Sequence, residues 1–556
     1  MTKANKKWHS IFKCLTALIL LGSFSMTTYI GHHIGQTLLQ DESNLYHTMS
    51  DREPLDVKVD MEHHHHNDHH NHHNDDNDDD IRGTLKCHGD GPSAQIAQEM
   101  IYWRDYPQDT LQQSPYQSLP NHPPPHQTKK KYMTVELDAG GFNNVRMTIE
   151  IAMAWAKATG RILVIPPRQG IYLMKGTYTL HDFYNLEGLD VMDMQDFLEM
   201  EVMTGEFGSL FPPDNRTDWS EQTPRHGIFE NEDADSRILN QYLRTIGWNT
   251  RWLAGQTLLY IAEDPECKEI PTSRDRHIFR EEGHPTPFNA TWQDRLAEVN
   301  VDDRDILLYD HTPDLIHIMA DDEAWIRLMH HFYYTIFFQS WSMDLWIKRY
   351  IRDKLRYKDE LFCRAGQIVE ALRQASVKEG NHGEFYTFHI RRGDFAHIGL
   401  VDDSQEIIDI TLGIVPRDAI VYIATDQKDK TWFSAFQNHF RGVYFLEDFP
   451  SQTEGMEDTS FFGFLDQIVA SRGKAFFGAF QSTFTAHIIT MMGYYSQIHK
   501  SPGYENGVIP AYFYAPKEVK NTYQDGYRPF RVNEDLIEMA YPLGWTGIDN
   551  GIDDFF

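Results

Sequence analysis

Arg391, Arg392 and Asp394 directly follow an apolar, aromatic-rich run, and residues of these types at this spacing could bind a diphosphate. The run from Phe385 to Ile390 has the composition of a buried strand. In α/β folds such strands deliver functional groups at their carboxyl ends, where ligands bind. Two guanidiniums there, with a carboxylate to hold one of them, suit a diphosphate. A strand that simply ends in a charged turn would carry the same residues.

The Gly140–Asn143 segment has the residue types of a second anion-binding turn. It separates an expected strand at 132–137 from an expected helix at about 145–159. Glycine lets the backbone approach a ligand closely, and a helix N-terminus offers unpaired N–H groups to an anion. Asn143 could cap this helix or bind the ligand. The segment lacks the third glycine of a dinucleotide fingerprint and the Gly-Lys-Ser/Thr of a P-loop.

Ser482 and Thr483 form a third such turn, because they separate a short apolar run from a helix expected at about 484–494. Their hydroxyl groups could cap that helix and also donate to a phosphate. Asp466 lies in the first part of an amphipathic helix expected at 463–470.

Alternating strands and helices must position these turns. Apolar, β-rich runs predict buried strands at 132–137, 161–167, 385–390, 419–424, 442–446 and 475–478. Such alternation implies parallel sheets, so the fold class is α/β, with two Rossmann-like domains and a ligand cleft between them. Between these two sets, residues 186–298 are acidic and irregular in pattern, and residues 322–376 have a helical pattern.

The N-terminus has the pattern of a membrane anchor. Residues 1–13 carry four lysines, and residues 14–30 form an apolar run near the lower limit for a bilayer span. A cleaved signal peptide is the competing interpretation, although Gly22–Ser25 is a poor cleavage site. The lysines place residues 1–13 in the cytosol and the bulk of the chain in the lumen, as a single-pass type II protein.

Residues 31–131 have the composition of a disordered lumenal stem. Residues 62–80 are almost entirely His, Asn and Asp, which cannot bury enough apolar surface to fold. We interpret this run as a spacer; the alternatives are a metal site or a sensor of low pH. The formal charge of −31 over 556 residues argues against nucleic acid as a partner.

Two sequons, at Asn215 and Asn289, predict glycosylation of a lumenal chain. Three cysteines, Cys87, Cys267 and Cys363, lie outside the apolar run. In an oxidising compartment at most one intramolecular bridge can form among them, and any of the three pairings is open.

Four segments, in this order, resemble the motifs of the GDP-fucose protein O-fucosyltransferase family and of its wider α1,2/α1,6/O-fucosyltransferase superfamily. They are Gly140–Asn143, His389–Asp394, Tyr422–Asp426, and Asp466 followed by Ser482–Phe484. The resemblance covers about residues 132–500. It implies a GT-B fold, GDP-fucose as donor, inversion at the anomeric carbon, and no required metal or other cofactor. We expect domains at 132–340 and 341–515, the second binding GDP-fucose, and a C-terminal tail at 516–556.

The resemblance also implies roles for individual residues. Arg391 would contact the β-phosphate and the glycosidic oxygen and stabilise the departing GDP, because charge develops there as the C–O bond breaks. Asp394 would orient the guanidiniums, and Asp466 would recognise the guanine or its ribose side. The remaining donor-binding residues would be Gly140, Gly141, Phe142, Asn143, His389, Ile390, Arg392, Ser482, Thr483 and Phe484.

Gly140 departs from the family pattern, because some members place a catalytic glutamate there. An inverting transfer normally needs a group that takes the acceptor proton. Asp138 is the nearest carboxylate and our candidate base; Glu136 is the next, and an asparagine-assisted mechanism without a formal base is the other option. The acceptor could be a protein Ser/Thr hydroxyl or a glycan hydroxyl, in the endoplasmic reticulum or the Golgi.

Two other functions fit the same residues. One is a transferase for another GDP-sugar, such as GDP-mannose. The other is a non-catalytic protein that binds a GDP-sugar or a glycan on the same fold, as the missing glutamate suggests.

Overall fold

The computed structural model describes residues 83–89, 91–104, 130–138, 140–186, 189–203, 239–240, 243–244, 247–250, 257–261, 305–308, 312–319, 336–338, 341–393, 403–456, 458–479, 482–502, 509–514 and 527–529. The expected membrane segment at 14–30, the His/Asp run, Asp394, Cys267 and both sequons lie outside these residues. Within them, no helix has the length and apolar character that crossing a bilayer requires.

The first sheet follows the pattern expected of a parallel sheet with both faces covered. Its strands lie in the order β6-β2-β1-β10-β7, and every neighbouring pair is parallel. They are β6 (Val191–Asp193), β2 (Ile162–Ile165), β1 (Tyr132–Val135), β10 (Leu315–Ile318) and β7 (Trp248–Thr250). The central strands are short apolar runs, which is the signature of burial on both faces.

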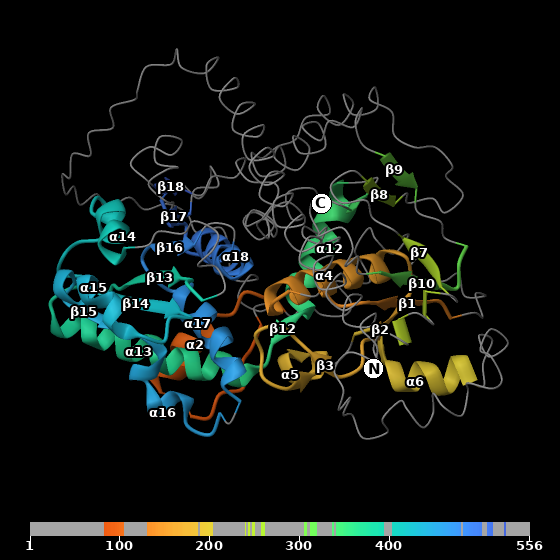
Figure 1. Cartoon of the computed structure of the whole chain (residues 1–556), viewed down its shortest axis with the longest axis horizontal. Coiled ribbons are helices and arrows are strands. Elements are labelled where there is room, and N and C mark those ends of the chain that lie inside the picture. Colours follow the sequence, from red (N-terminus) through yellow and green to blue (C-terminus); the bar gives the residue numbers. More distant parts are fainter. Residues whose placement is uncertain are drawn as a thin grey trace, which may run out of the picture. The chain divides into compact units, whose positions relative to one another are not determined.

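Helix α4 (Phe142–Ala158) connects β1 to β2 (Figure 1). It begins three residues earlier than the pattern predicted, so Asn143 lies inside its first turn. The expectation that residues 186–298 are irregular was wrong in part, since β6, β7 and β8 (Thr257–Ile261) come from it. These strands have at most five residues, too few for a clear period-2 pattern.

Smaller elements complete this half. Strands β3 (Gln169–Gly170) and β4 (Thr177–Tyr178) form a hairpin, and β8 pairs with β9 (Asp305–Leu308) and β11 (Ile336–Phe338). The short elements α5 (Leu180–Phe183), α6 (Met194–Phe197) and a π-helix (Leu198–Met203) lie between them in sequence. The helical pattern of residues 322–376 resolves into α12 (Trp341–Lys354) and α13 (Asp359–Lys378), separated by β12 (Arg356–Tyr357), which pairs with β5 (Tyr184–Asn185).

The second sheet has the strand order of a doubly wound fold. Its six strands lie in the order β15-β14-β13-β16-β17-β18, and all neighbours are parallel except the last pair. They are β13 (Tyr386–Ile390), β14 (Ile420–Thr425), β15 (Gly442–Tyr444), β16 (Phe476–Ala479), β17 (Ala511–Tyr514) and β18 (Tyr527–Pro529). This is the order 3-2-1-4-5-6, whose winding reverses between β13 and β16, where such folds bind ligands.

The predicted α/β class with parallel sheets is therefore confirmed. The helices of this half are α14 (Ser404–Thr411), α15 (Ser434–His439), α16 (Pro450–Thr453), α17 (Phe462–Ala470) and α18 (Thr483–Ile498). Strand β18 comes from the region expected to be a tail.

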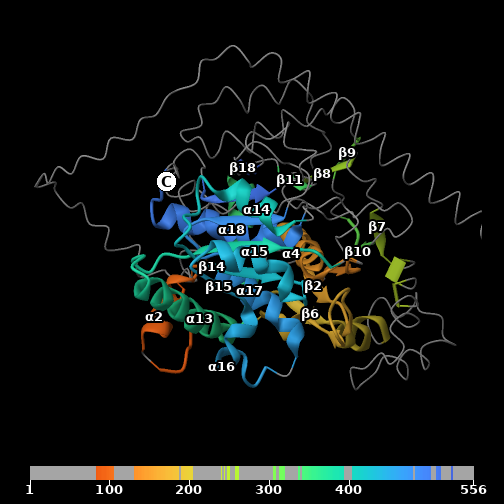
Figure 2. The same cartoon turned by 60° about the vertical axis from the view of Figure 1, so that its left-hand side comes forward.

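Residues 83–104 belong to the fold, whereas the sequence placed them in a disordered stem. Helix α2 (Pro92–Glu99) lies beside α13 in both views (Figures 1 and 2), and a disulfide joins Cys87 to Cys363 on α13. A Cβ at Gly366 would lie 2.5 Å from the Ser93 carbonyl oxygen, so only glycine permits this helix contact. Met100 to Trp103 are completely buried, and this burial compensates for ordering the segment.

One cluster of buried hydrophobic residues extends through both halves. It includes Ile149 of α4, Ile351 of α12, Leu372 of α13 and Leu465 of α17. The helices between the sheets therefore share a core, through which the two halves pack against each other.

Candidate active site

A cavity of about 420 Å³ lies where the expected donor-binding turns meet. Its volume is within the range of about 300–1,000 Å³ that ligand sites occupy. Eight of the residues singled out from the sequence line it: Gly141, Phe142, Asn143, His389, Arg391, Asp466, Thr483 and Phe484. Gly140, Ile390, Arg392, Ser482 and Asp138 do not line it. A second cavity of about 450 Å³ is lined by His181, Lys358 and four neighbours, and none of the candidate site residues lines it.

The turn after β13 separates the two arginines. Asp426, at the end of the neighbouring strand β14, accepts from the backbone N–H groups of Arg392 (2.7 Å) and Gly393 (2.9 Å). A Cβ at residue 393 would lie 2.6 Å from that carboxylate, so a larger residue there would have to displace the Asp426 side chain. Arg391 lines the cavity, whereas the Arg392 guanidinium stacks 4.4 Å from the Trp432 ring centroid. Arg392 therefore does not line the cavity together with Arg391, contrary to the expectation.

His389 is an uncharged part of the cavity wall. Its Nδ1 lies 2.7 Å from Thr485 Oγ1, and its ring stacks on Phe484 at 4.4 Å. Burial, followed by the nearby charge of Arg391, lowers the pKa of His389 to about 3. The ring is therefore neutral at physiological pH, and Arg391 is the cation of this part of the cavity.

The N-terminus of α18 opens onto the cavity through Thr483 and Phe484. Ser482 occupies the N-cap position, but its side chain makes no capping hydrogen bond, contrary to the expectation. Its hydroxyl is buried, with no partner in the described part of the chain. The first N–H groups of a helix have no intrahelical acceptor, and they favour an anion at this end.

Asp466 is the buried acid of the site. Tyr422 donates to its Oδ1 at 2.6 Å. The side chain reaches the cavity, but enough protein surrounds it that burial raises its pKa to about 7. The predicted contact with guanine would use this carboxyl group as an acceptor for ring N–H groups.

The opposite wall comes from the N-terminal half. Gly141 is the N-cap of α4, so Asn143 does not cap the helix, which was one of the two roles considered for it. Phe142 packs against Phe183 (4.6 Å) and Phe464 (4.4 Å), which anchors the turn between the halves. The side chain of Asn143 is 8% exposed, and its Oδ1 accepts from Gln467 Nε2 at 2.9 Å.

The two candidate carboxylates before this turn have different environments. Asp138 is half-buried, and its Oδ1 accepts from Gly140 N at 2.6 Å. Glu136 is buried, where it bonds Arg244 Nε at 2.5 Å and His317 Nε2 at 2.8 Å. Burial alone would raise the pKa of Glu136, but the hydrogen bonds from His317 and Arg244 outweigh it and hold that pKa below its usual value. Glu136 is thus engaged in an ion-pair cluster away from the cavity.

The loop of the β3–β4 hairpin forms an apolar rim at the cavity. Tyr172 and Leu173 line the cavity, yet their side chains are 52% and 62% exposed. Leu173 has a φ of 68°, which is strained for a branched residue. Lys175 N donates to Ser460 Oγ at 3.0 Å, and this bond ties the loop to the other half. Nothing in the sequence pattern singled out this rim.

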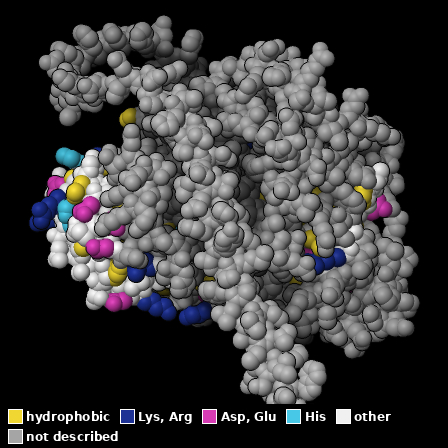
Figure 3. Space-filling view, turned by 45° about the horizontal axis from the view of Figure 1, so that its top comes forward, with side chains coloured by type: hydrophobic (Ala, Val, Ile, Leu, Met, Phe, Trp, Pro, Cys, Tyr) yellow, Lys and Arg dark blue, Asp and Glu magenta, His cyan; other side chains and the backbone are white. Residues whose placement is uncertain are grey.

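Lys, Arg, Asp and Glu side chains are interspersed on the described part of the surface that Figure 3 shows. Among the described residues, no three His, Cys, Asp or Glu side chains are grouped as a metal site requires.

The sequence matches the model of one protein family, described as GDP-fucose protein O-fucosyltransferase, over residues 132–495. No curated protein matches the chain. Two solved structures with similarity to it are NodZ α1,6-fucosyltransferase soaked with GDP-fucose (14% identity, 65% of this chain and 92% of that chain, TM-score 0.32) and fucosyltransferase NodZ from Bradyrhizobium (15%, 66% and 94%, 0.32). A third is POFUT1 in complex with GDP-fucose (12%, 70% and 99%, 0.32).

Proposed function

This chain belongs to the GDP-fucose protein O-fucosyltransferase family and is a GDP-fucose-dependent fucosyltransferase, and we propose that it transfers L-fucose with inversion to a hydroxyl group of a protein or glycan in the secretory pathway. We also propose that its two halves form a GT-B arrangement, with the donor bound between the ends of the two sheets. No metal ion is required in this proposal, since protein groups neutralise the diphosphate.

The observation that carries this proposal is that Arg391 and the N-terminus of α18 line one cavity with the Gly141–Asn143 turn of the other half. A cation and a helix N-terminus together suit a diphosphate. In the transfer, the acceptor oxygen bonds to the anomeric carbon from the face opposite GDP. The bond from that carbon to the β-phosphate oxygen breaks, and its electron pair leaves with GDP. Arg391 stabilises the charge that develops there, which favours the transition state over the ground state.

The acceptor proton needs a destination, and we propose Asp138 for it. Its Oδ1 accepts from Gly140 N, and the side chain does not line the cavity, so it must move toward the acceptor when the substrates bind. An Asp138→Asn variant tests this role. If Asp138 takes the proton, turnover should fall by about 10²-fold. Unchanged turnover would instead favour transfer without a formal base.

The disulfide between Cys87 and Cys363 supports a lumenal location, because such bonds persist in oxidising compartments. A type II anchor at residues 14–30, glycosylation of Asn215 and Asn289, and a place in the Golgi or endoplasmic reticulum remain our proposals for the rest of the chain.

GDP release from GDP-fucose by the purified chain tests the function, with folded protein modules and N-glycans offered as acceptors. We expect turnover with GDP-fucose, little with GDP-mannose, and a loss of about 10²-fold in Arg391→Ala. Absence of turnover with every acceptor would contradict the proposal.

A further inference from the structure

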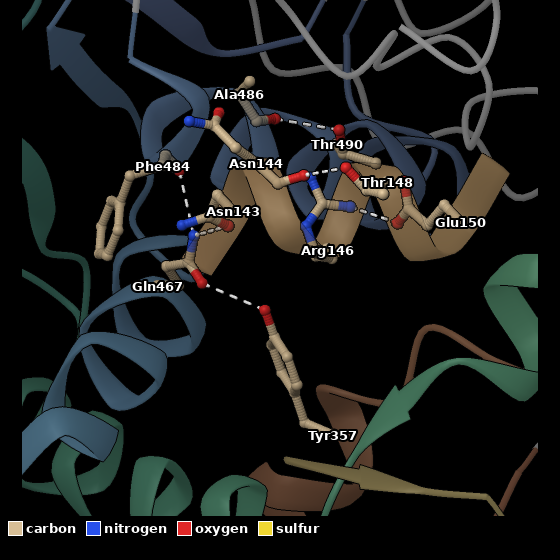
Figure 4. Close-up of polar contacts among 10 residues, drawn as sticks. All are labelled: Asn143, Asn144, Arg146, Thr148, Glu150, Tyr357, Gln467, Phe484, Ala486 and Thr490. Atoms are coloured by element: carbon tan, nitrogen blue, oxygen red, sulfur yellow. Dashed lines mark hydrogen bonds and ion pairs between the residues drawn. The ribbon is translucent and has the colours of Figure 1, made fainter. Parts of the chain in front are cut away.

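Gln467 joins three elements beside the cavity. It follows Asp466 on α17, lines the cavity, and is 1% exposed. Its side chain contacts Asn143 of α4, Phe484 of α18 and Tyr357 of β12, as Figure 4 shows. Nothing in the family resemblance assigns it a role.

The orientation of the Gln467 amide is determined by its two other partners. The Phe484 carbonyl can only accept a hydrogen bond, so Nε2 of Gln467 must face it, at 3.3 Å. Oε1 accepts from the Tyr357 hydroxyl, also at 3.3 Å. Burial raises the pKa of Tyr357, so this phenol keeps its proton and donates. A reversed amide would set two acceptors against each other at Phe484.

This orientation determines how Asn143 is presented. The second N–H of Gln467 Nε2 points to Asn143, whose Oδ1 accepts it at 2.9 Å. The Asn143 carbonyl oxygen is thereby occupied. Its Nδ2 has no acceptor in the described part of the chain, and Asn143 lines the cavity. The chain therefore offers N–H groups, and not an oxygen, to a ligand at this point.

We propose that Gln467 is a positioning residue that holds Asn143 as a hydrogen-bond donor toward the departing diphosphate, an inference that rests on the proposed function. An amide nitrogen has a delocalised lone pair and takes no proton at neutral pH. Asn143 is therefore not the proton acceptor of an asparagine-assisted transfer. An N–H group preset where negative charge develops lowers the barrier without reorganisation. The main-chain oxygen of Phe484 thus orients the Gln467 amide, and the Gln467 amide in turn determines that Asn143 presents its N–H groups to the cavity.

Asn143→Asp separates a donor role from a structural one. The new carboxylate can still accept from Gln467 Nε2, but it turns an oxygen instead of an N–H group to the cavity. We expect a loss of about 10²-fold in kcat, with the melting temperature nearly unchanged and a smaller rise in donor KM. A proton-accepting residue at this position would gain activity from the same change.

Gln467→Glu should reverse the orientation of the Asn143 amide. A carboxylate cannot donate to Phe484 O or to Asn143 Oδ1, so Asn143 must turn its Nδ2 toward residue 467. We expect a comparable loss in kcat. Gln497→Glu is the matched control, since it places the same group at a buried site in the last turn of α18, outside the cavity lining. Its kcat per folded protein should equal that of the wild type.

Retained turnover in Asn143→Asp, within about threefold of the wild type, would overturn the inference. If the wild type binds GDP-fucose but never turns it over, the proposed function fails alone. The affinity for GDP-fucose then tests the donor role of Asn143. The carboxylate of Asn143→Asp would face the diphosphate and should weaken GDP-fucose binding by about tenfold or more. Equal affinity of the two proteins would contradict the donor role.

Discussion

Tyr422 donates a 2.6 Å hydrogen bond to Asp466, a carboxyl group of the cavity lining whose pKa burial raises to about 7. Burial favours the protonated acid, and the Tyr422 hydroxyl favours the carboxylate. The protonation state of Asp466 therefore changes within the physiological range.

The affinity for GDP-fucose should consequently rise with pH through about 7, because the ionised carboxylate is the better acceptor for guanine N–H groups. Tyr422→Phe removes a bond to the charged form, so the midpoint should move to higher pH. Asp466→Asn should bind weakly at every pH, without this step. Calorimetric titration with GDP-fucose between about pH 5.5 and 8.5 measures all three. A wild-type affinity that is flat across pH 7 would rule out this use of Asp466.

Arg391 and Arg392 should differ sharply although they are adjacent. Arg391→Lys should reduce kcat by about 10²-fold, because an ammonium cannot make the bidentate contact of a guanidinium. Arg392→Lys loses its stacking on Trp432 and should cost only a few-fold. Steady-state kinetics of the two variants checks this, each serving as the control for the other. Equal losses would mean that both guanidiniums contact the donor.

The Tyr172 rim should bind the acceptor. Tyr172→Ala removes an aromatic side chain from the cavity mouth and should raise the acceptor KM by about tenfold. Slow hydrolysis of GDP-fucose without acceptor should change by less than about threefold. Leu412→Ala, at a residue 55% exposed just after α14, is the control for removing an exposed apolar side chain. A rise in donor KM instead would assign the rim to GDP-fucose.

Reduction of the Cys87–Cys363 bond should destabilise the fold by about 2–5 kcal/mol, because the bond closes a long loop of the unfolded chain. Thermal unfolding with and without dithiothreitol measures the effect. In the double variant Cys87→Ser, Cys363→Ser the protein should already be less stable, and dithiothreitol should have no further effect. A wild-type melting temperature that is the same with and without dithiothreitol would show that the bond contributes little to the stability of the fold.

The sequence predicted the strands that are buried on both faces, because such strands are continuous apolar runs. It also located Arg391 and the α18 N-terminus, since one follows the end of a strand and the other is the start of a helix. Asp466, in the middle of α17, was located through the family motif. The short strands β6 and β7 were missed, because three residues give no period and their pairing depends on the neighbouring strands.

The contacts of single side chains depended on neighbours that the sequence does not reveal. Asp426 reaches the Arg392 turn only because β14 lies next to β13. Gln467 resembles any polar residue of an amphipathic helix, and two of its three partners, Tyr357 and Asn143, lie 110 and 324 residues away in the chain. The same reason explains why residues 83–104 were assigned to a disordered stem. Residues 83–104 follow a His/Asn/Asp-rich run in the sequence, and their packing against α13 cannot be read from that sequence.

The contact of α2 with α13 has a consequence for folding during synthesis. Cys87 leaves the ribosome 276 residues before its partner, so the apolar side chains of 83–104 must wait, uncovered, until α13 follows. The N-terminal sheet is thus an insertion within a unit that closes only when both of its separated parts have been made. We expect the early segment to depend on chaperones and disulfide exchange in the meantime, and truncated chains ending before α13 to aggregate.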